Sequence, residues 1–138
     1  ATNKINYFVV DFLDAVKSNT EWAAPMPSDY NGGTITAVFY WVADSSSTNS
    51  VVWGIQGRAY ADSDAIDQAY GTAIEVTDAN NAQLDVNISA ATSAVTLGGT
   101  PAASQYVQWR VYRDATAGGD NLAATARLLG VRISYTRT

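Results

Sequence analysis

The chain has 138 residues, of which 47% are hydrophobic and only 15% are charged, and its formal net charge is −5. It contains no histidine and no cysteine. It therefore lacks the commonest general base, the commonest metal ligand and the strongest side-chain nucleophile, and it has no disulfide framework. These absences favour a protein that binds or assembles over an enzyme. The acidic balance argues against nucleic acid as a partner.

The length is typical of one domain, so we expect a single domain over residues 1–138. No stretch approaches the roughly 18 consecutive apolar residues of a membrane-spanning helix. We therefore expect no membrane partner.

In chain order, the first expected strand covers residues 5–13 and is apolar on both faces, which indicates burial on both sides. A second strand over residues 20–24 ends before Pro25 and Pro27, because proline cannot donate a hydrogen bond to a sheet. A turn over residues 28–33 follows.

Two strong strands are expected over residues 34–43 and 51–61, because apolar and polar residues alternate along both. A polar loop over residues 44–49 separates them, which predicts an antiparallel hairpin. The residues expected to face the core are Ile35, Ala37, Phe39 and Trp41 in the first strand and Val51, Trp53, Ile55, Gly57 and Ala59 in the second.

One helix is expected, near residues 63–70. Asp62 or Ser63 can cap its start, and acidic residues in its first turn suit the helix dipole. The acidic residues of this segment could alternatively ligate calcium, but the segment lacks the glycine and the final glutamate of an EF-hand loop.

Short strands are expected over residues 72–77, 83–88, 94–97, 106–113 and 128–135. About nine short strands and one short helix predict an all-β fold, namely an antiparallel two-sheet β-sandwich of jelly-roll type with one short helix near residues 63–70.

No set of residues predicts catalysis. Glu21 and Glu75 are the only glutamates, and nothing in the pattern places two carboxylates at the separation that a glycosidase needs. The loop over residues 114–120 is expected to be a solvated hairpin loop, not a cation site. We therefore expect no catalytic residues, no cofactor and no metal.

The aromatic residues have two interpretations. Trp41, Trp53 and Trp109 lie on apolar strand faces and are expected in the core. Trp22 and Tyr30 flank the two prolines and the turn, where they could stack on a sugar ring. The favoured alternative is that they close an edge of the sandwich.

The charges are unevenly distributed. Residues 1–103 carry three Lys or Arg and eleven Asp or Glu, which gives −8, whereas residues 104–138 carry five Arg and two Asp, which gives +3. We expect these charges to balance within the fold. The densest cationic group is Arg110, Arg113, Arg127 and Arg132 on the outward side of the late strands. It could pair with acids of another subunit or with acids of its own chain, such as Glu75 or Asp85.

Several segments resemble, in order, a family of small structural proteins of tailed bacteriophages. They are Met26 and Pro27 and residues 30–41 (YNGGTITAVFYW), 51–59 (VVWGIQGRA), 64–73 (DAIDQAYGTA), 99–102 (GTPA), 107–114 (VQWRVYRD) and 126–135 (ARLLGVRISY).

This resemblance implies a non-enzymatic component of the virion surface. The role that it favours is a capsid decoration (cement) protein, a homotrimer bound to the major capsid protein. Residues 1–6 would form an extended arm that adds a strand to a neighbour, with Ala1, Thr2, Asn3 and Lys4 as contacts to the capsid or to another subunit.

Two other roles remain open. One is a fibre-tip or carbohydrate-binding module that contacts host glycans through Trp22 and Tyr30. The other is an extracellular filament subunit in which residues 5–13 insert into the next molecule.

Overall fold

A computed structural model describes residues 5–137, and within this range the protein contains eight β-strands and no helix. Residues 5–137 therefore contain no helix that could span a membrane. The strands are β1 (Val10–Phe12), β2 (Ser18–Pro25), β3 (Tyr30–Ala43), β4 (Ser50–Tyr60), β5 (Ile74–Ala79), β6 (Asn87–Ile88), β7 (Tyr106–Arg113) and β8 (Ala126–Arg137).

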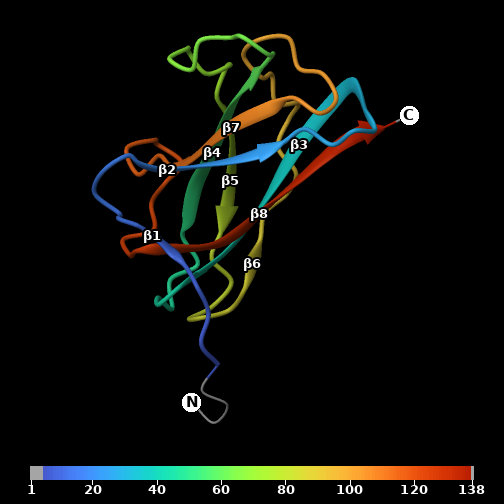
Figure 1. Ribbon diagram of the computed structural model, residues 1–138. Helices are drawn as coiled ribbons and strands as arrows, with labels where there is room; N and C mark the ends of the chain where they lie inside the picture. The colour runs from blue at the N-terminus through green and yellow to red at the C-terminus, as the bar shows by residue number, and fades with distance from the viewer. Residues whose placement is uncertain (1–4, 138) are drawn as a thin grey trace.

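The strands form two antiparallel four-stranded sheets. The β8 sheet has the order β1-β8-β3-β6, and the β7 sheet has the order β2-β7-β4-β5. In four of the ladders β1 pairs with β8, β2 with β7, β3 with β6, and β4 with β5. A long hairpin that wraps into two layers produces this pairing, which is the topology of a jelly roll (Figure 1). The predicted all-β jelly-roll sandwich is confirmed.

The predicted hairpin between residues 34–43 and 51–61 is wrong. β3 pairs with β8 and β6, whereas β4 pairs with β5 and β7, so the two strands lie in opposite sheets. Their apolar faces then meet across the core, where the rings of Trp41 and Trp53 lie 6.1 Å apart. In one sheet these two faces would lie side by side and would both need cover from a second layer.

The helix predicted near residues 63–70 is also wrong, because residues 61–73 form an irregular loop. Ser63 has a φ of 74°, which a right-handed helix cannot contain. The hydroxyl of Tyr60, at the end of β4, donates to the carbonyl oxygen of Ile66 at 2.9 Å. Side chains of the sheet therefore satisfy backbone groups that a helix would have paired internally.

The first strand is shorter and more exposed than predicted. Only residues 10–12 of the predicted strand over residues 5–13 pair with β8, and of these only Phe12 is buried. The Phe12 ring packs edge-on against Trp53, with 5.2 Å between the ring centroids. Residues 5–9 form no strand and run away from the sandwich below β1 (Figure 1).

An irregular segment covers the outer edge of β3. The backbone N–H groups of Ser89 and Thr92 donate to the carbonyl oxygens of Phe39 and Ala37, at 3.0 and 2.9 Å. Their hydroxyls accept from the N–H groups of the same two β3 residues, at 2.9 and 3.0 Å. The strand predicted over residues 94–97 is wrong, but this segment still protects the edge from pairing with another chain.

The core lies between the two sheets, as predicted. Trp41 and Trp53 are fully buried and Trp109 is 5% exposed. Six other residues of β3 and β4 that were expected to face the core also belong to it: Ile35, Ala37, Phe39, Val51, Ile55 and Ala59. Gly57 is the exception, because it has no side chain to contribute.

Arg113 is the main exception to the predicted surface. Instead of facing outward it is fully buried. It forms a two-pronged ion pair with Asp120, with nitrogen–oxygen distances of 2.9 and 2.7 Å. Its Nη1 donates to the carbonyl oxygens of Phe12 and Ala124, at 3.3 and 2.7 Å. The prediction that the loop over residues 114–120 is solvated is wrong for Asp120, because its carboxylate lies in the protein interior.

Two of the other late arginines pair with early acids, as predicted. Arg110 pairs with Glu21 at 2.6 Å, and Arg127 lies 3.7 Å from Asp11. In both pairs a late arginine meets an early acid, because late strands lie beside early strands in this topology. Arg132 is exposed and forms no ion pair with the residues that the structure describes.

We predict that Asp120→Ala lowers the free energy of unfolding by about 3–5 kcal/mol, because it leaves a buried guanidinium without its counter-charge. Urea denaturation measures this difference. Arg127→Ala, which removes an exposed ion pair, is the matched control and should cost less than about 1 kcal/mol. Equal small losses in both variants would show that the buried pair is not required for stability.

Candidate assembly site

One side of the β8 sheet is open. β1 pairs only with residues 126–128 at the start of β8. Directly after them β8 has one extra residue, Leu129, between the partners of Tyr40 and Trp41. Such a bulge bends a strand, increases its twist and often ends pairing. Residues 130–137 therefore have β3 on one side and, within the described part of the chain, no strand on the other.

An apolar groove of about 320 Å³ lies beside this open edge, between β8 and β2. We call it the edge groove; its main apolar residues are Val10, Trp22, Leu129, Val131 and Ile133. A second hollow of about 190 Å³ shares Trp22 and Ile133 with it. The inward side chains of β8 are only partly buried here because no strand covers them.

Trp22 and Tyr30, the glycan contacts of the alternative role, do not share a surface. Trp22 lines the edge groove and stacks on Trp109, with 6.2 Å between the ring centroids and 18° between the ring planes. Tyr30 is buried, and its hydroxyl donates to the carbonyl oxygen of Gly33 at 2.8 Å. Both placements fit the favoured interpretation, in which the two aromatics close an edge of the sandwich.

The segment that precedes β1 is apolar and exposed. We call residues 5–9 the arm. Phe8 is 99% exposed and Ile5 is 76% exposed, and Tyr7 and Val9 are also exposed. Large apolar side chains that are exposed together indicate an interaction surface. The predicted contacts Ala1, Thr2, Asn3 and Lys4 lie outside the described residues.

The carboxylates of residues 5–137 form no metal site. No group of three or more acidic side chains within residues 5–137 could hold a metal ion. The two glutamates are both engaged: Glu21 pairs with Arg110, and Glu75 accepts a hydrogen bond from Tyr112 at 2.8 Å. Hydrogen bonds from Lys17 and Thr116 hold the pKa of Asp114 below its usual range, so this carboxyl is an ordinary anion.

The arm and the edge groove are complementary. The arm has apolar side chains without cover, the groove has an apolar lining without cover, and the neighbouring edge of β8 has backbone groups without a strand partner. No family model, curated protein or solved structure matches this chain.

The sequence contained a signal for this site. The apolar residues on both faces of residues 5–13 predict a strand buried on both sides. A segment of this kind needs two covering layers, and within one subunit the arm has neither. The edge groove left no signal, because it arises from the bulge at Leu129 and the shortness of β1.

We predict that chymotrypsin cleaves dilute protein first after Tyr7 and Phe8, because the arm is extended and exposed. The product keeps Phe12 and its core contacts, so it should keep the melting temperature of the intact chain. Mass spectrometry identifies the cut, and circular dichroism measures the melting. Initial cleavage after Tyr106, which is 44% exposed within a strand, would contradict the accessibility of the arm.

Proposed function

We propose that this protein is a non-enzymatic structural subunit of a virion, a capsid decoration (cement) protein that assembles with copies of itself on the major capsid protein. The observation that carries the proposal is that one subunit has an exposed apolar arm, an open sheet edge and an apolar groove. On an isolated subunit such surfaces favour aggregation, so a partner that covers them is the physical requirement.

The mode of assembly is strand addition. The arm of one copy lies along residues 130–137 of β8 in the next copy, where it adds backbone hydrogen bonds and places alternate side chains in the edge groove. Within its own subunit the arm leaves β8, because the bulge at Leu129 ends the β1 ladder. The arm is therefore directed toward a neighbour.

Head-to-tail donation closes into a ring when the rotation between subunits is suitable, which agrees with the proposed trimer. Without closure, the same contact would build the alternative filament. In either assembly the donated segment is residues 5–9, because residues 10–12 already pair with β8 of their own subunit and Phe12 belongs to its core.

The virion assignment has two further supports. The sheet order is that of a jelly roll, an architecture that is frequent in viral capsid domains and in lectins. The chain also resembles small structural proteins of tailed bacteriophages over the segments given above. A surface with few charges and no reactive side chains suits a particle coat.

We predict that Phe8→Asp and Ile133→Glu each convert the assembled protein to a monomer, because each puts a charge into the contact between arm and groove. Analytical ultracentrifugation measures the mass. Leu84→Asp is the control, because Leu84 is an exposed apolar residue outside both the arm and the edge groove. This variant should leave the mass unchanged. A wild-type protein that is monomeric at all concentrations would remove the proposal.

We predict that the purified protein binds capsids that lack it and raises the temperature at which they release their contents. Co-sedimentation measures the binding, and dye accessibility of the packaged genome measures the release. The Phe8→Asp variant should bind more weakly, because it loses contacts between neighbouring copies. Density for this protein only at a tail or fibre tip would refute the decoration role.

A further inference from the structure

The outer face of the β7 sheet carries a separate hollow of about 680 Å³. Tyr106, Gln108 and Arg110 line its base, since they alternate along β7 with the buried Val107 and Trp109. β2 contributes Glu21, which pairs with Arg110, and β4 contributes Tyr60, which is opposite Tyr106 in the ladder. The volume lies within the range of about 300–1,000 Å³ that is typical of small-molecule sites.

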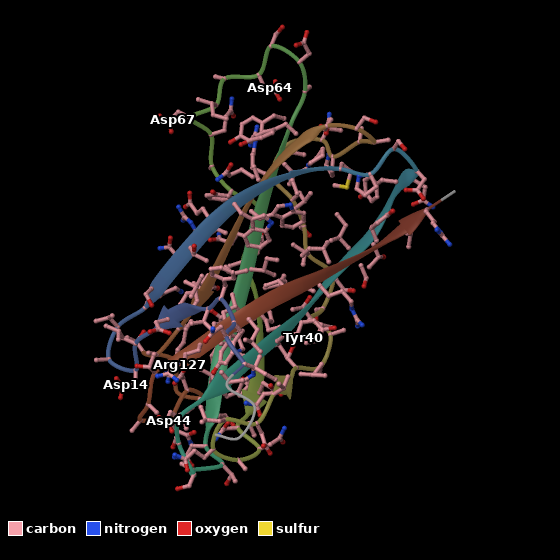
Figure 2. All side chains as sticks on the ribbon, turned by 60° about the horizontal axis from the view of Figure 1, so that its bottom comes forward. Asp14, Tyr40, Asp44, Asp64, Asp67 and Arg127 are labelled. Atoms are coloured by element: carbon pink, nitrogen blue, oxygen red, sulfur yellow. The ribbon has the colours of Figure 1, made fainter. Side chains whose placement is uncertain are left out.

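The loop over residues 61–73 forms one side of this hollow, and Figure 2 shows the labelled Asp67 on it. Side chains of β4 hold the loop in place. Arg58 donates to the side-chain oxygen of Gln68 at 2.9 Å, and Gln56 donates to the carbonyl oxygen of Gly71 at 3.2 Å. The hollow is therefore built before any ligand arrives, which lowers the entropic cost of binding.

Three tyrosines give the hollow its aromatic surface, and we call it the tyrosine pocket. The Tyr106 ring is partly exposed and lies 5.6 Å from the Tyr60 ring. The Tyr70 ring lies under the guanidinium of Arg110, at 4.4 Å. Burial, and then the charge of Glu21, raise the pKa of Tyr70, so its hydroxyl stays protonated. Tyrosine supplies an apolar ring face together with a polar tip.

The polar groups of the pocket suit a neutral ligand. Among residues 5–137, Arg110 is the one cationic side chain that lines the pocket, and it pairs with Glu21 at 2.6 Å. Asp67 lines the pocket and forms no side-chain hydrogen bond with residues 5–137, so its carboxylate is available to accept from a ligand. An ionised carboxylate accepts strong hydrogen bonds from hydroxyl groups.

We infer that the tyrosine pocket binds an uncharged oligosaccharide. A sugar ring lays its C–H face on Tyr106, and its hydroxyls donate to Asp67. Sugars combine an apolar ring face with many hydroxyl donors, which matches partly exposed tyrosine rings beside a carboxylate and amide side chains. The site is distinct from the Trp22 and Tyr30 pair that the sequence suggested, and it does not rest on the proposed assembly.

The test begins with a printed array of neutral hexose and N-acetylhexosamine oligosaccharides, with sialylated and sulfated glycans as the charged comparison. The neutral probe with the strongest signal is then titrated in solution by isothermal calorimetry. We expect Tyr106→Ala and Asp67→Asn each to weaken its binding at least tenfold. Asp67→Asn keeps the shape of the side chain, so it separates loss of the carboxylate from loss of structure.

Tyr40→Ala is the matched control, because Tyr40 lies on β3 in the other sheet, well away from Asp67 in Figure 2. The inference is supported if Tyr40→Ala and Phe8→Asp still bind the neutral glycan and the two pocket variants do not. The preserved binding of Phe8→Asp also separates this site from assembly. Binding of charged glycans only, binding that the pocket variants retain, or no binding of any neutral probe at millimolar concentration overturns it.

Discussion

The buried ion pair between Arg113 and Asp120 organises one end of the sandwich. Arg113 belongs to the β7 sheet, yet its guanidinium donates to the carbonyl oxygen of Phe12 in the β8 sheet and to the loop that leads into β8. Asp120 in turn accepts from the backbone N–H of Val52 in β4. A buried charge must satisfy all its donors within the protein, so the two side chains of this pair position β1, β4 and the loop together.

The anchored β1 determines where the subunit is open. Phe12 holds the short strand in the core, and the bulge at Leu129 ends its ladder with β8. The opposite edge of the same sheet is covered, because Ser89 and Thr92 take up the hydrogen bonds of β3. The open backbone groups of β8 and the apolar lining therefore lie together, and the arm starts from β1, whose Val10 lines the same groove. This arrangement gives the proposed assembly a direction.

The proposed assembly and saccharide surfaces use different parts of the jelly roll. The edge groove lies between the two sheets, where a missing strand leaves core side chains partly exposed. The tyrosine pocket lies on the outer face of the β7 sheet, where a loop anchored by Arg58 and Tyr60 builds one side of it. A subunit can thus contact its neighbours through an edge and still present a face to the surroundings.

Alternation of apolar and polar residues was enough to predict the β-sandwich and the burial of Trp41, Trp53 and Trp109, because side chains of a strand point alternately to its two faces. It could not predict that β3 and β4 lie in opposite sheets, since alternation specifies a face and not a partner strand. Nor could it predict the loop over residues 61–73, whose helix signals are local while the hydrogen bonds that overrule them come from β4. The buried Arg113, the open edge of β8, the edge groove and the tyrosine pocket depend on contacts between residues distant in sequence, and only the tertiary structure determines those contacts.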